Sequence, residues 1–280
     1  MKDRQTQLAE RVARQTKIDT HYVDPIWTPN VNVPQLELLI ACPLPQNPVV
    51  LLPEMRFKSL LKLIVECLPP VGKLMIVDSV NTRFEAIRNL CPGMPHSLYF
   101  SAQNLGALNY SEGIFSALLT QLSLPTLAQA RRILPEYARV LRVGGRIVAA
   151  IPLWGSFPAF FDLLQECLLK LSPAEADLSE IKEAMSLEFN QHLCEQFRLK
   201  PDANDIETFE LVFDNVEQLL FSTLVESNFL SYCLAMLLER TDPKQLLMLL
   251  VRAFHHYFQN ETLRVPFKIA IFGATKQDKM

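Results

Sequence analysis

The sequence has little glycine: eight residues in 280, and the first of them is Gly72. Folds that bring a nucleotide phosphate against the backbone do so through glycine-rich loops, because a Cβ atom obstructs the approach. Neither the G-x-G-x-x-G pattern nor a Walker loop occurs anywhere in the chain. A dinucleotide-dependent oxidoreductase and a P-loop enzyme are therefore both disfavoured.

Closely spaced cysteines are also absent, since no two of the six are closer than 24 residues in sequence. That spacing excludes the C-x-x-C clip of zinc and redox sites. The histidine pair His255–His256 and the isolated His192 have no convergent ligands that the sequence identifies. We expect reduced thiols in the core and no metal site.

The chain lacks a strong charge of either sign, with a net charge of -3 and a pI near 6.0. Such a balance gives no long-range attraction to nucleic acid or anionic lipid, so neither partner is expected. The most apolar stretch, Leu219 to Leu238, is interrupted by Glu226 and three serines, which favours a buried helix over a membrane span. The first 17 residues carry both charge signs and no apolar core, so we expect a cytoplasmic protein.

What the sequence does have, from residue 48 onward, is short apolar strands alternating with helices. The strands are expected at 49–53, 73–78, 97–101, 114–119 and 146–152. This alternation is typical of a parallel sheet. The expected fold class is α/β, with a doubly wound, Rossmann-like, mostly parallel sheet, an antiparallel edge and extra C-terminal helices.

Helix signals lie between and beyond these strands. Thr82 and Thr126 each begin a T-x-x-E/Q capping pattern. Pro135 is expected to bend or split the second of these helices, and Gly144–Gly145 to end it. Further along, helix starts are predicted at Ser172–Pro173, at Asp214–Glu217 and at Asp242–Pro243.

The domain organisation follows from this order of elements. An N-terminal helix and proline-rich arm occupies 1–47, and an α/β core occupies 48–155. The remainder, 156–280, is a helical insertion or lid together with two strands, 208–213 and 265–272. These two strands are expected to pair antiparallel at one edge of the sheet.

Three segments resemble one family, the class I S-adenosylmethionine-dependent methyltransferases of the type 11 kind. RRILPEYARVLRVGGRIVAAIPLWGSF (131–157) is similar to the family's helix, Gly-Gly turn and fifth strand. LMIVDSVNTRFEAIRN (74–89) resembles the second strand with its terminal acid, and YFSAQNLGALNYSEGIFSALLTQLSLP (99–125) the third strand, adenine-side loop and fourth strand. The resemblance covers roughly 48–155.

The resemblance implies S-adenosylmethionine as cofactor and assigns residues to its site. Asp78 is placed to accept the ribose hydroxyls, although it also suits a role that merely caps the following turn. The other cofactor-side positions are Glu54, Ser101, Ala102 and Gln103. Gln121 and Trp154 follow the fourth and fifth strands, on the substrate side of the same crevice.

The chain departs from the family pattern where the cofactor should lie. Pro53, Glu54, Met55 and Arg56 stand in place of the glycine-rich loop, and Ser101 and Ser116 replace two expected acids. The leading hypothesis is therefore a methyltransferase-like pseudoenzyme with a degenerate cofactor site.

Such a protein acts on a small molecule or a protein partner by binding it. The alternative is an active methyltransferase on a small or apolar substrate with the C-terminal helices as lid, and the weakest reading is a dinucleotide oxidoreductase. Oligomeric state is not determined by the sequence. We further expect the loop 53–57 to narrow the crevice, with Arg56 reaching Glu54 or Asp78.

Overall fold

The computed structural model describes residues 31–41, 44–54, 58–67, 72–79, 84, 97–122, 124–173, 176–225, 229–230, 232–233, 242–258 and 262–278. These residues form a seven-stranded sheet in the order β3-β2-β1-β4-β5-β7-β6. Strands β1 to β5 are parallel, and β7 pairs antiparallel with both β5 and β6. The predicted fold class is confirmed. The strands are β1 (Val49–Pro53), β2 (Lys73–Asp78), β3 (Ser97–Ala102), β4 (Phe115–Gln121), β5 (Leu141–Pro152), β6 (Leu199–Phe213) and β7 (Leu263–Lys276).

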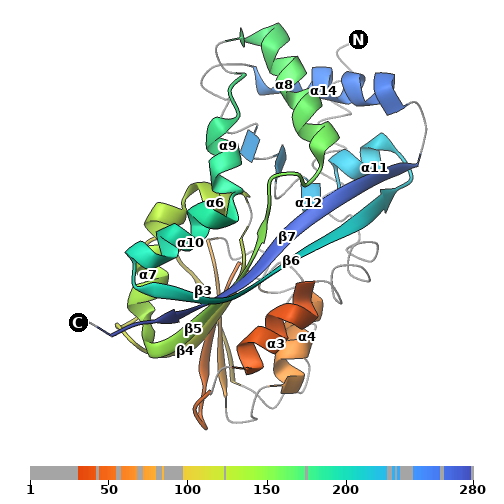
Figure 1. Ribbon diagram of the computed structural model, residues 1–280. Coiled ribbons are helices and arrows are strands. Elements are labelled where there is room, and N and C mark those ends of the chain that lie inside the picture. The colour runs from red at the N-terminus through yellow and green to blue at the C-terminus, as the bar shows by residue number, and fades with distance from the viewer. Residues whose placement is uncertain are drawn as a thin grey trace.

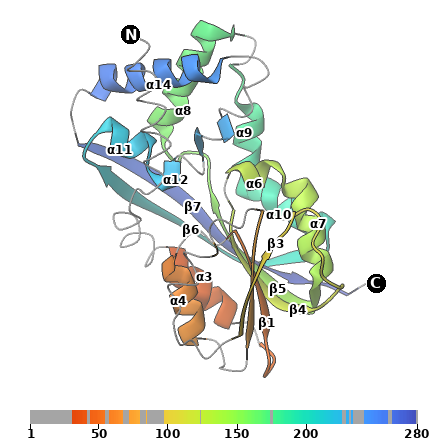
Figure 2. The same ribbon diagram turned by 180° about the vertical axis from the view of Figure 1, so that it is seen from behind.

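Helices cover both faces of the sheet and extend beyond one of its edges (Figures 1 and 2). Helices α3 and α4 lie on one face, and α6, α7 and α10 lie on the other. Beyond the carboxyl ends of the parallel strands, α8 packs against α14, with α9, α11 and α12 beside them. The bounds are α3 (Val33–Ile40), α4 (Lys58–Cys67), α6 (Leu124–Ala128), α7 (Ala130–Val140), α8 (Pro158–Leu171), α9 (Ser179–Ala184), α10 (Leu187–Gln196), α11 (Val216–Leu220), α12 (Thr223–Val225) and α14 (Pro243–Phe258).

The central strands separate two apolar cores. Successive residues of a strand point to opposite faces, so Leu51 joins the large core while Val50 and Leu52 join a smaller one. Leucines of α3 and α4 complete the smaller core. β4 is buried along its whole length, and its sequence FSALLTQ accordingly lacks the strict alternation of apolar and polar residues that a half-exposed strand shows.

The antiparallel edge is a long pair of strands, β6 and β7, that runs from the sheet into the group of helices α8, α9, α11, α12 and α14, called the helical cap below (Figure 1). β6 and β7 pair continuously from Leu199 with Lys276 to Phe213 with Leu263, apart from an irregularity at 201–203. The predicted pairing is confirmed, and both strands are longer than expected. The residues beyond the prediction are 199–207 of β6 and 263–264 and 273–276 of β7; residues 200–207 bury no side chain, so they carry no apolar pattern that indicates a strand.

The helix expected after Thr126 differs from the structure in two ways. The break falls at Gln129, between α6 and α7, and Pro135 lies inside α7. α7 ends at Val140 and β5 begins at Leu141, so Gly144–Gly145 does not end the helix. Instead Gly144, with φ +72°, lies within the strand, where the pairing of β4 with β5 changes register.

One C-terminal expectation is wrong and another is tested only in part. A 3-10 turn begins at Pro173, where Ala176 N donates to Pro173 O (3.4 Å), but residues 174–175 lie outside the described ranges. The next helix, α9, starts at Ser179, whose N–H donates to the Asp177 carboxylate (2.9 Å). The stretch 219–238 is not one helix, because α11 ends at Leu220 and the Ser222 hydroxyl accepts from Val225 N to begin another turn. The predicted start at Asp242–Pro243 is confirmed by α14.

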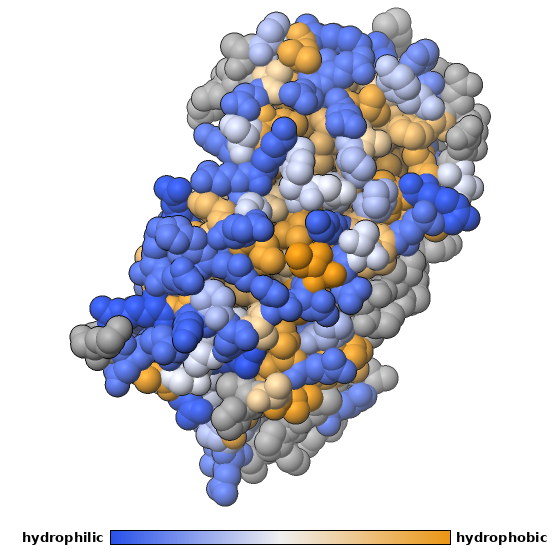
Figure 3. Space-filling view, in the orientation of Figure 1, coloured by the Kyte–Doolittle hydropathy of each residue, from blue (hydrophilic) through white to orange (hydrophobic). Residues whose placement is uncertain are grey.

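Several other expectations are settled in part. Cys167, Cys194 and Cys233 are buried free thiols, as predicted. The helix expected after Thr82 falls outside the described residues except at 84. Within the described ranges, none of the helices has the length and apolar character required to cross a membrane. In Figure 3 hydrophilic residues separate the apolar patches of the visible face.

Candidate functional site

The candidate site lies at the carboxyl ends of the parallel strands. The chain passes from β1 to β2 and β3 on one side and returns to β4 and β5 on the other, so the topology switches between β1 and β4. Open α/β sheets bind ligands outside the carboxyl ends at such a switch point. The strands here end at Pro53, Asp78, Ala102 and Gln121.

Glu54 follows β1 directly and has φ +49°. This left-handed backbone is the conformation that glycine adopts at no steric cost. The Glu54 N–H donates to Val77 O (2.8 Å), which fixes the turn against β2. Its carboxylate accepts a hydrogen bond from the Thr126 hydroxyl at the start of α6. The turn thus keeps a glycine-like backbone but carries a carboxylate that is already bound within the protein.

Asp78 ends β2 and has only 3% of its surface exposed. Ser79 Oγ donates weakly to its carboxylate (3.4 Å), and its backbone carbonyl accepts from Gln103 N (2.9 Å). A carboxylate must face the crevice to accept the two ribose hydroxyls of a nucleoside. At this exposure Asp78 is enclosed by protein.

The segment after β3 forms a closed polar loop. Gln103 Nε2 donates to Ser101 Oγ (2.8 Å), and Gln103 Oε1 accepts from Asn109 N (2.7 Å). Burial raises the pKa of the neighbouring Tyr110, an effect that Ser101 and then Gln103 partly offset. Ala102 is exposed and pairs with Asp78 in the sheet. Ser101, Ala102 and Gln103 therefore adjoin Asp78 as predicted, with their polar groups turned to one another.

Gln121 is the last residue of β4, not a residue beyond it, and it joins a buried cluster of carboxamides. Its Nε2 donates to Asn32 Oδ1 (2.7 Å) and to Gln35 Oε1 (2.9 Å). Gln35 Nε2 in turn donates to Thr120 O (3.0 Å). Asn32 and Gln35 are fully buried. Residues at the start of α3 thus occupy the position next to Gln121.

Thr120 and Tyr137 form a second polar group, on the face of β4 opposite Gln121. Within the described part of the chain, their hydroxyls are buried and make no hydrogen bond of normal geometry, and on the other face the Oε1 of Gln121 is likewise buried without a partner. Burial holds the pKa of Tyr137 well above its ordinary value, and the charge of Glu54 raises it further, while the Thr120 hydroxyl lowers it. These unsatisfied atoms gather at the switch point.

Trp154 follows β5 and is held by the helical cap. Its ring centroid lies 4.8 Å from that of Phe161, with the two rings tilted by 40°, and Lys182 Nζ lies 4.9 Å from the Trp154 ring centroid. The backbone N–H of Trp154 donates to Met185 O (3.0 Å). Trp154 therefore fixes α8 and the α9–α10 turn to the end of β5.

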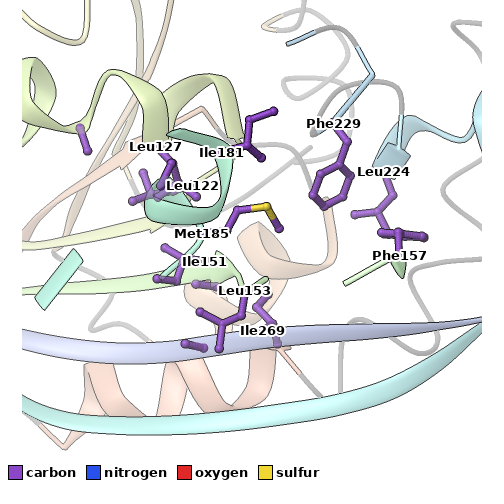
Figure 4. Packing of buried hydrophobic residues seen from close by; sticks show 14 of the residues in the cluster. Leu122, Leu127, Ile151, Leu153, Phe157, Ile181, Met185, Leu224, Phe229 and Ile269 are labelled. Carbon is purple, nitrogen blue, oxygen red and sulfur yellow. The ribbon is translucent and has the colours of Figure 1, made fainter. Parts of the chain in front are cut away.

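Apolar side chains from the sheet and from the helices beyond it meet above the carboxyl ends of β4 and β5 and the middle of β7 (Figure 4). They come from strands, loops and helices far apart in the sequence and are all buried. The labelled residues are Leu122, Leu127, Ile151, Leu153, Phe157, Ile181, Met185, Leu224, Phe229 and Ile269.

Sequence reasoning missed four residues of this site: Asn32, Gln35, Thr126 as a partner of Glu54, and Tyr137. Asn32 precedes Pro34 at the start of a helix, a signal that was present but was read only as an arm. Ser116 lies at the amino end of β4, at the other end of the strands from the candidate site, and its hydroxyl accepts from Val49 N (3.3 Å). Residues 55–57 are outside the described ranges, so the expected ion pair of Arg56 stays a prediction.

No group of three metal-ligating side chains occurs among the described residues. Comparison with protein-family models gave no match, and comparison with curated proteins gave none either.

Solved structures do match. A protein of Bacillus halodurans inferred to be a methyltransferase superposes with TM-score 0.54 and 12% identity, covering 87% of this chain and 99% of the other. The YcgJ protein of Bacillus subtilis gives a TM-score of 0.54 and 13% identity, and the match covers 88% of this chain and 100% of YcgJ. A Haloferax volcanii complex of the Trm112 methyltransferase activator with an inferred methyltransferase gives TM-score 0.50, 10% identity and coverage of 95% and 97%.

Proposed function

Because the chain has the class I S-adenosylmethionine-dependent methyltransferase fold, we propose that it is a methyltransferase-like pseudoenzyme. Its cofactor site is degenerate, and it acts by binding a small molecule or a protein partner. A cytoplasmic location is part of the proposal, because the composition carries no attraction to lipid.

The observation that carries the proposal is the internal engagement of the groups that would hold a cofactor. Asp78 is enclosed, Glu54 is bound by Thr126, and Ser101 is bound by Gln103. A ligand that replaced these contacts would have to break each one and desolvate the groups again, which lowers its net affinity.

The turn after β1 supports the same conclusion. Its backbone has the glycine-like conformation at Glu54, but a Cβ and a carboxylate stand where a cofactor would approach closely. The half-buried carboxylate of Glu54 also repels the carboxylate of an amino-acid moiety.

Isothermal titration calorimetry with S-adenosylmethionine and with S-adenosylhomocysteine tests the proposal. We expect no saturable heat for either ligand at concentrations up to about 1 mM, a range in which cofactor sites of ordinary affinity saturate. Micromolar binding that Asp78→Ala abolishes would falsify the proposal. The matched control is Asp205→Ala, which removes an exposed acid on β6, away from the crevice.

The alternative is an active methyltransferase acting on a small or apolar substrate. The observation that favours it is the buried apolar group in Figure 4, which the cap places over the ends of β4 and β5. Orientation of a nucleophile alone accelerates methyl transfer, so no conspicuous base is required. Incubation with tritiated S-adenosylmethionine and an acyl-chain library distinguishes the two functions, because only the active enzyme transfers label into an apolar product.

A further inference from the structure

The sheet parts between β1 and β4 at its carboxyl end. β1 is paired with β4 along only two of its residues, Val50 and Leu51. On their other sides, β1 stays paired with β2 as far as Pro53, and β4 stays paired with β5 as far as Gln121. Residues 119–121 of β4 therefore have no partner on β1 among the described residues. This parting lies at the switch point where the candidate site begins.

The first turn of α3 bonds to the parted end of β4. Gln35 Nε2 donates to Thr120 O (3.0 Å), a backbone carbonyl that lies beyond the last pair of β4 with β1. Gln35 Oε1 accepts from Gln121 Nε2 (2.9 Å), which also donates to Asn32 Oδ1 (2.7 Å). Asn32 and Gln35 are fully buried. Three side-chain hydrogen bonds thus tie the start of α3 to the end of β4, on the sheet face opposite α6 and α7 (Figure 2).

Two features make this attachment incomplete. Gln121 Oε1 is buried and makes no hydrogen bond within the described part of the chain, so this oxygen loses its hydration without replacement. Asn32 stands at the N-cap of α3, but its side chain makes no capping hydrogen bond to the helix and accepts from Gln121 instead. Water would satisfy both groups if the start of α3 moved away from β4.

The second turn of α3 is held differently. Leu36 and Leu39 are buried in the smaller core, together with side chains of β1 and α4. An isolated helix of eight residues is not stable in water, so α3 depends on these apolar contacts. Ahead of the helix Val31 is also buried, so movement of the first turn exposes one apolar side chain there. The buried face of α3 therefore changes along its length from carboxamides to leucines.

We propose that residues 31–35 form a latch over the parting between β1 and β4. The latch releases from β4 as a unit, while the leucines of α3 stay in the smaller core. In the closed form the Gln121 carboxamide and the Thr120 carbonyl are bound by Asn32 and Gln35, so a ligand reaches these groups only after release. The latch acts in a pseudoenzyme and in an active enzyme alike, because it controls access to the crevice rather than chemistry.

Hydrogen exchange measured residue by residue tests the release. The amides of residues 37–39 donate within α3 to the carbonyls of residues 33–35, which belong to the latch. In the wild type at pH 7 these amides should exchange about 100-fold faster than those of residues 117–121 in β4, after correction for intrinsic rates, because the latch opens while the sheet stays folded. Equal protection of the two segments overturns the proposal, since α3 then opens only when the sheet unfolds.

Gln121→Met tests whether the carboxamides hold the latch. Methionine keeps the length of the side chain but removes both hydrogen bonds to α3, so the amides of residues 37–39 should exchange about tenfold faster, while those of β4 stay within about twofold. Asn32→Ala removes one of these bonds and should speed the same amides about threefold; in the Gln121→Met background it should have less than about a twofold effect. Gln245→Met, at an exposed position of α14, is the matched control and should change neither segment.

Three outcomes overturn the latch. Equal effects of Gln121→Met and Gln245→Met on the α3 amides remove the role of the carboxamides. Acceleration of the β4 amides by the same factor as the α3 amides means that the carboxamides stabilise the whole sheet. Additive effects of Asn32→Ala and Gln121→Met mean that the two residues do not act through one bond. If Gln121→Met does not fold, Asn32→Ala against Asn204→Ala, at an exposed position of β6, decides the same question.

Discussion

Tyr137→Phe should make this protein more stable. The Tyr137 side chain is fully buried, and its hydroxyl makes no hydrogen bond of normal geometry within the described residues, although the Thr120 hydroxyl is near enough to lower its pKa. A buried polar group without a partner costs about 1–3 kcal/mol, and phenylalanine removes the hydroxyl while it keeps the ring that fills the core. Allowing for relaxation around the site, we expect the free energy of unfolding to rise by about 1 kcal/mol.

Urea unfolding followed by circular dichroism measures this change, and the melting temperature should rise by about 2 °C. Tyr257→Phe, at a 57% exposed position, is the control and should stay within about 0.5 kcal/mol of the wild type. A loss of stability in Tyr137→Phe would refute the reasoning, because it would mean that the hydroxyl donates a hydrogen bond in solution. A double-mutant cycle with Thr120→Val then identifies whether Thr120 is the acceptor.

Other predictions follow from the ionisable groups. Glu136→Gln should lower the free energy of unfolding by about 1–2 kcal/mol at pH 7, because the carboxylate accepts from Arg139 and from Leu108 N. The hydrogen bond with Arg139 lowers the pKa of Glu136, so the stability that this carboxylate contributes is present above about pH 4 and is lost as the pH falls further. Urea titrations that give the same difference in free energy of unfolding between wild type and Glu136→Gln at pH 3 and at pH 7 contradict this role of Glu136. Burial raises the pKa of Cys194 and of Cys233 to about 12, so iodoacetamide at pH 8 should leave both thiols unmodified in the native protein. Peptide mass mapping measures this labelling, and rapid modification of either cysteine refutes its burial.

The sequence predicts the parallel core well, since buried strands such as 73–78 are short apolar runs between helix signals. Sequence patterns do not predict the elements whose bounds are set by tertiary contacts. The start of β5 at Leu141, with Gly144 inside the strand, depends on a register change against β4 that local pattern does not specify. The sequence does not predict the first half of β6, because residues 200–207 bury no side chain and are held by β7 alone.

The candidate site divides in the same way. The resemblance placed Glu54, Asp78 and Ser101 at adjacent strand ends, which follows from strand order. The hydrogen-bond partners of the site residues could not be predicted from the sequence. Thr126 is 72 residues from Glu54, and Asn32 and Gln35 are more than 80 residues from Gln121. Contacts of that sequence separation are set by how the chain closes in three dimensions.

The position of β7 between β5 and β6 has a consequence for how the chain reaches its native state. β6 has no neighbour in the sheet other than β7, so residues 199–213 cannot join the sheet until residues 263–276 are available. During synthesis from the ribosome, β1 to β5 have their partners early, whereas β6 and its buried Leu211 and Phe213 wait. That interval exposes an unpaired strand with apolar residues at its C-terminal end, a condition under which chaperones bind nascent chains and strands associate wrongly. Folding yield should therefore depend more on the last strand than its contribution to the core suggests.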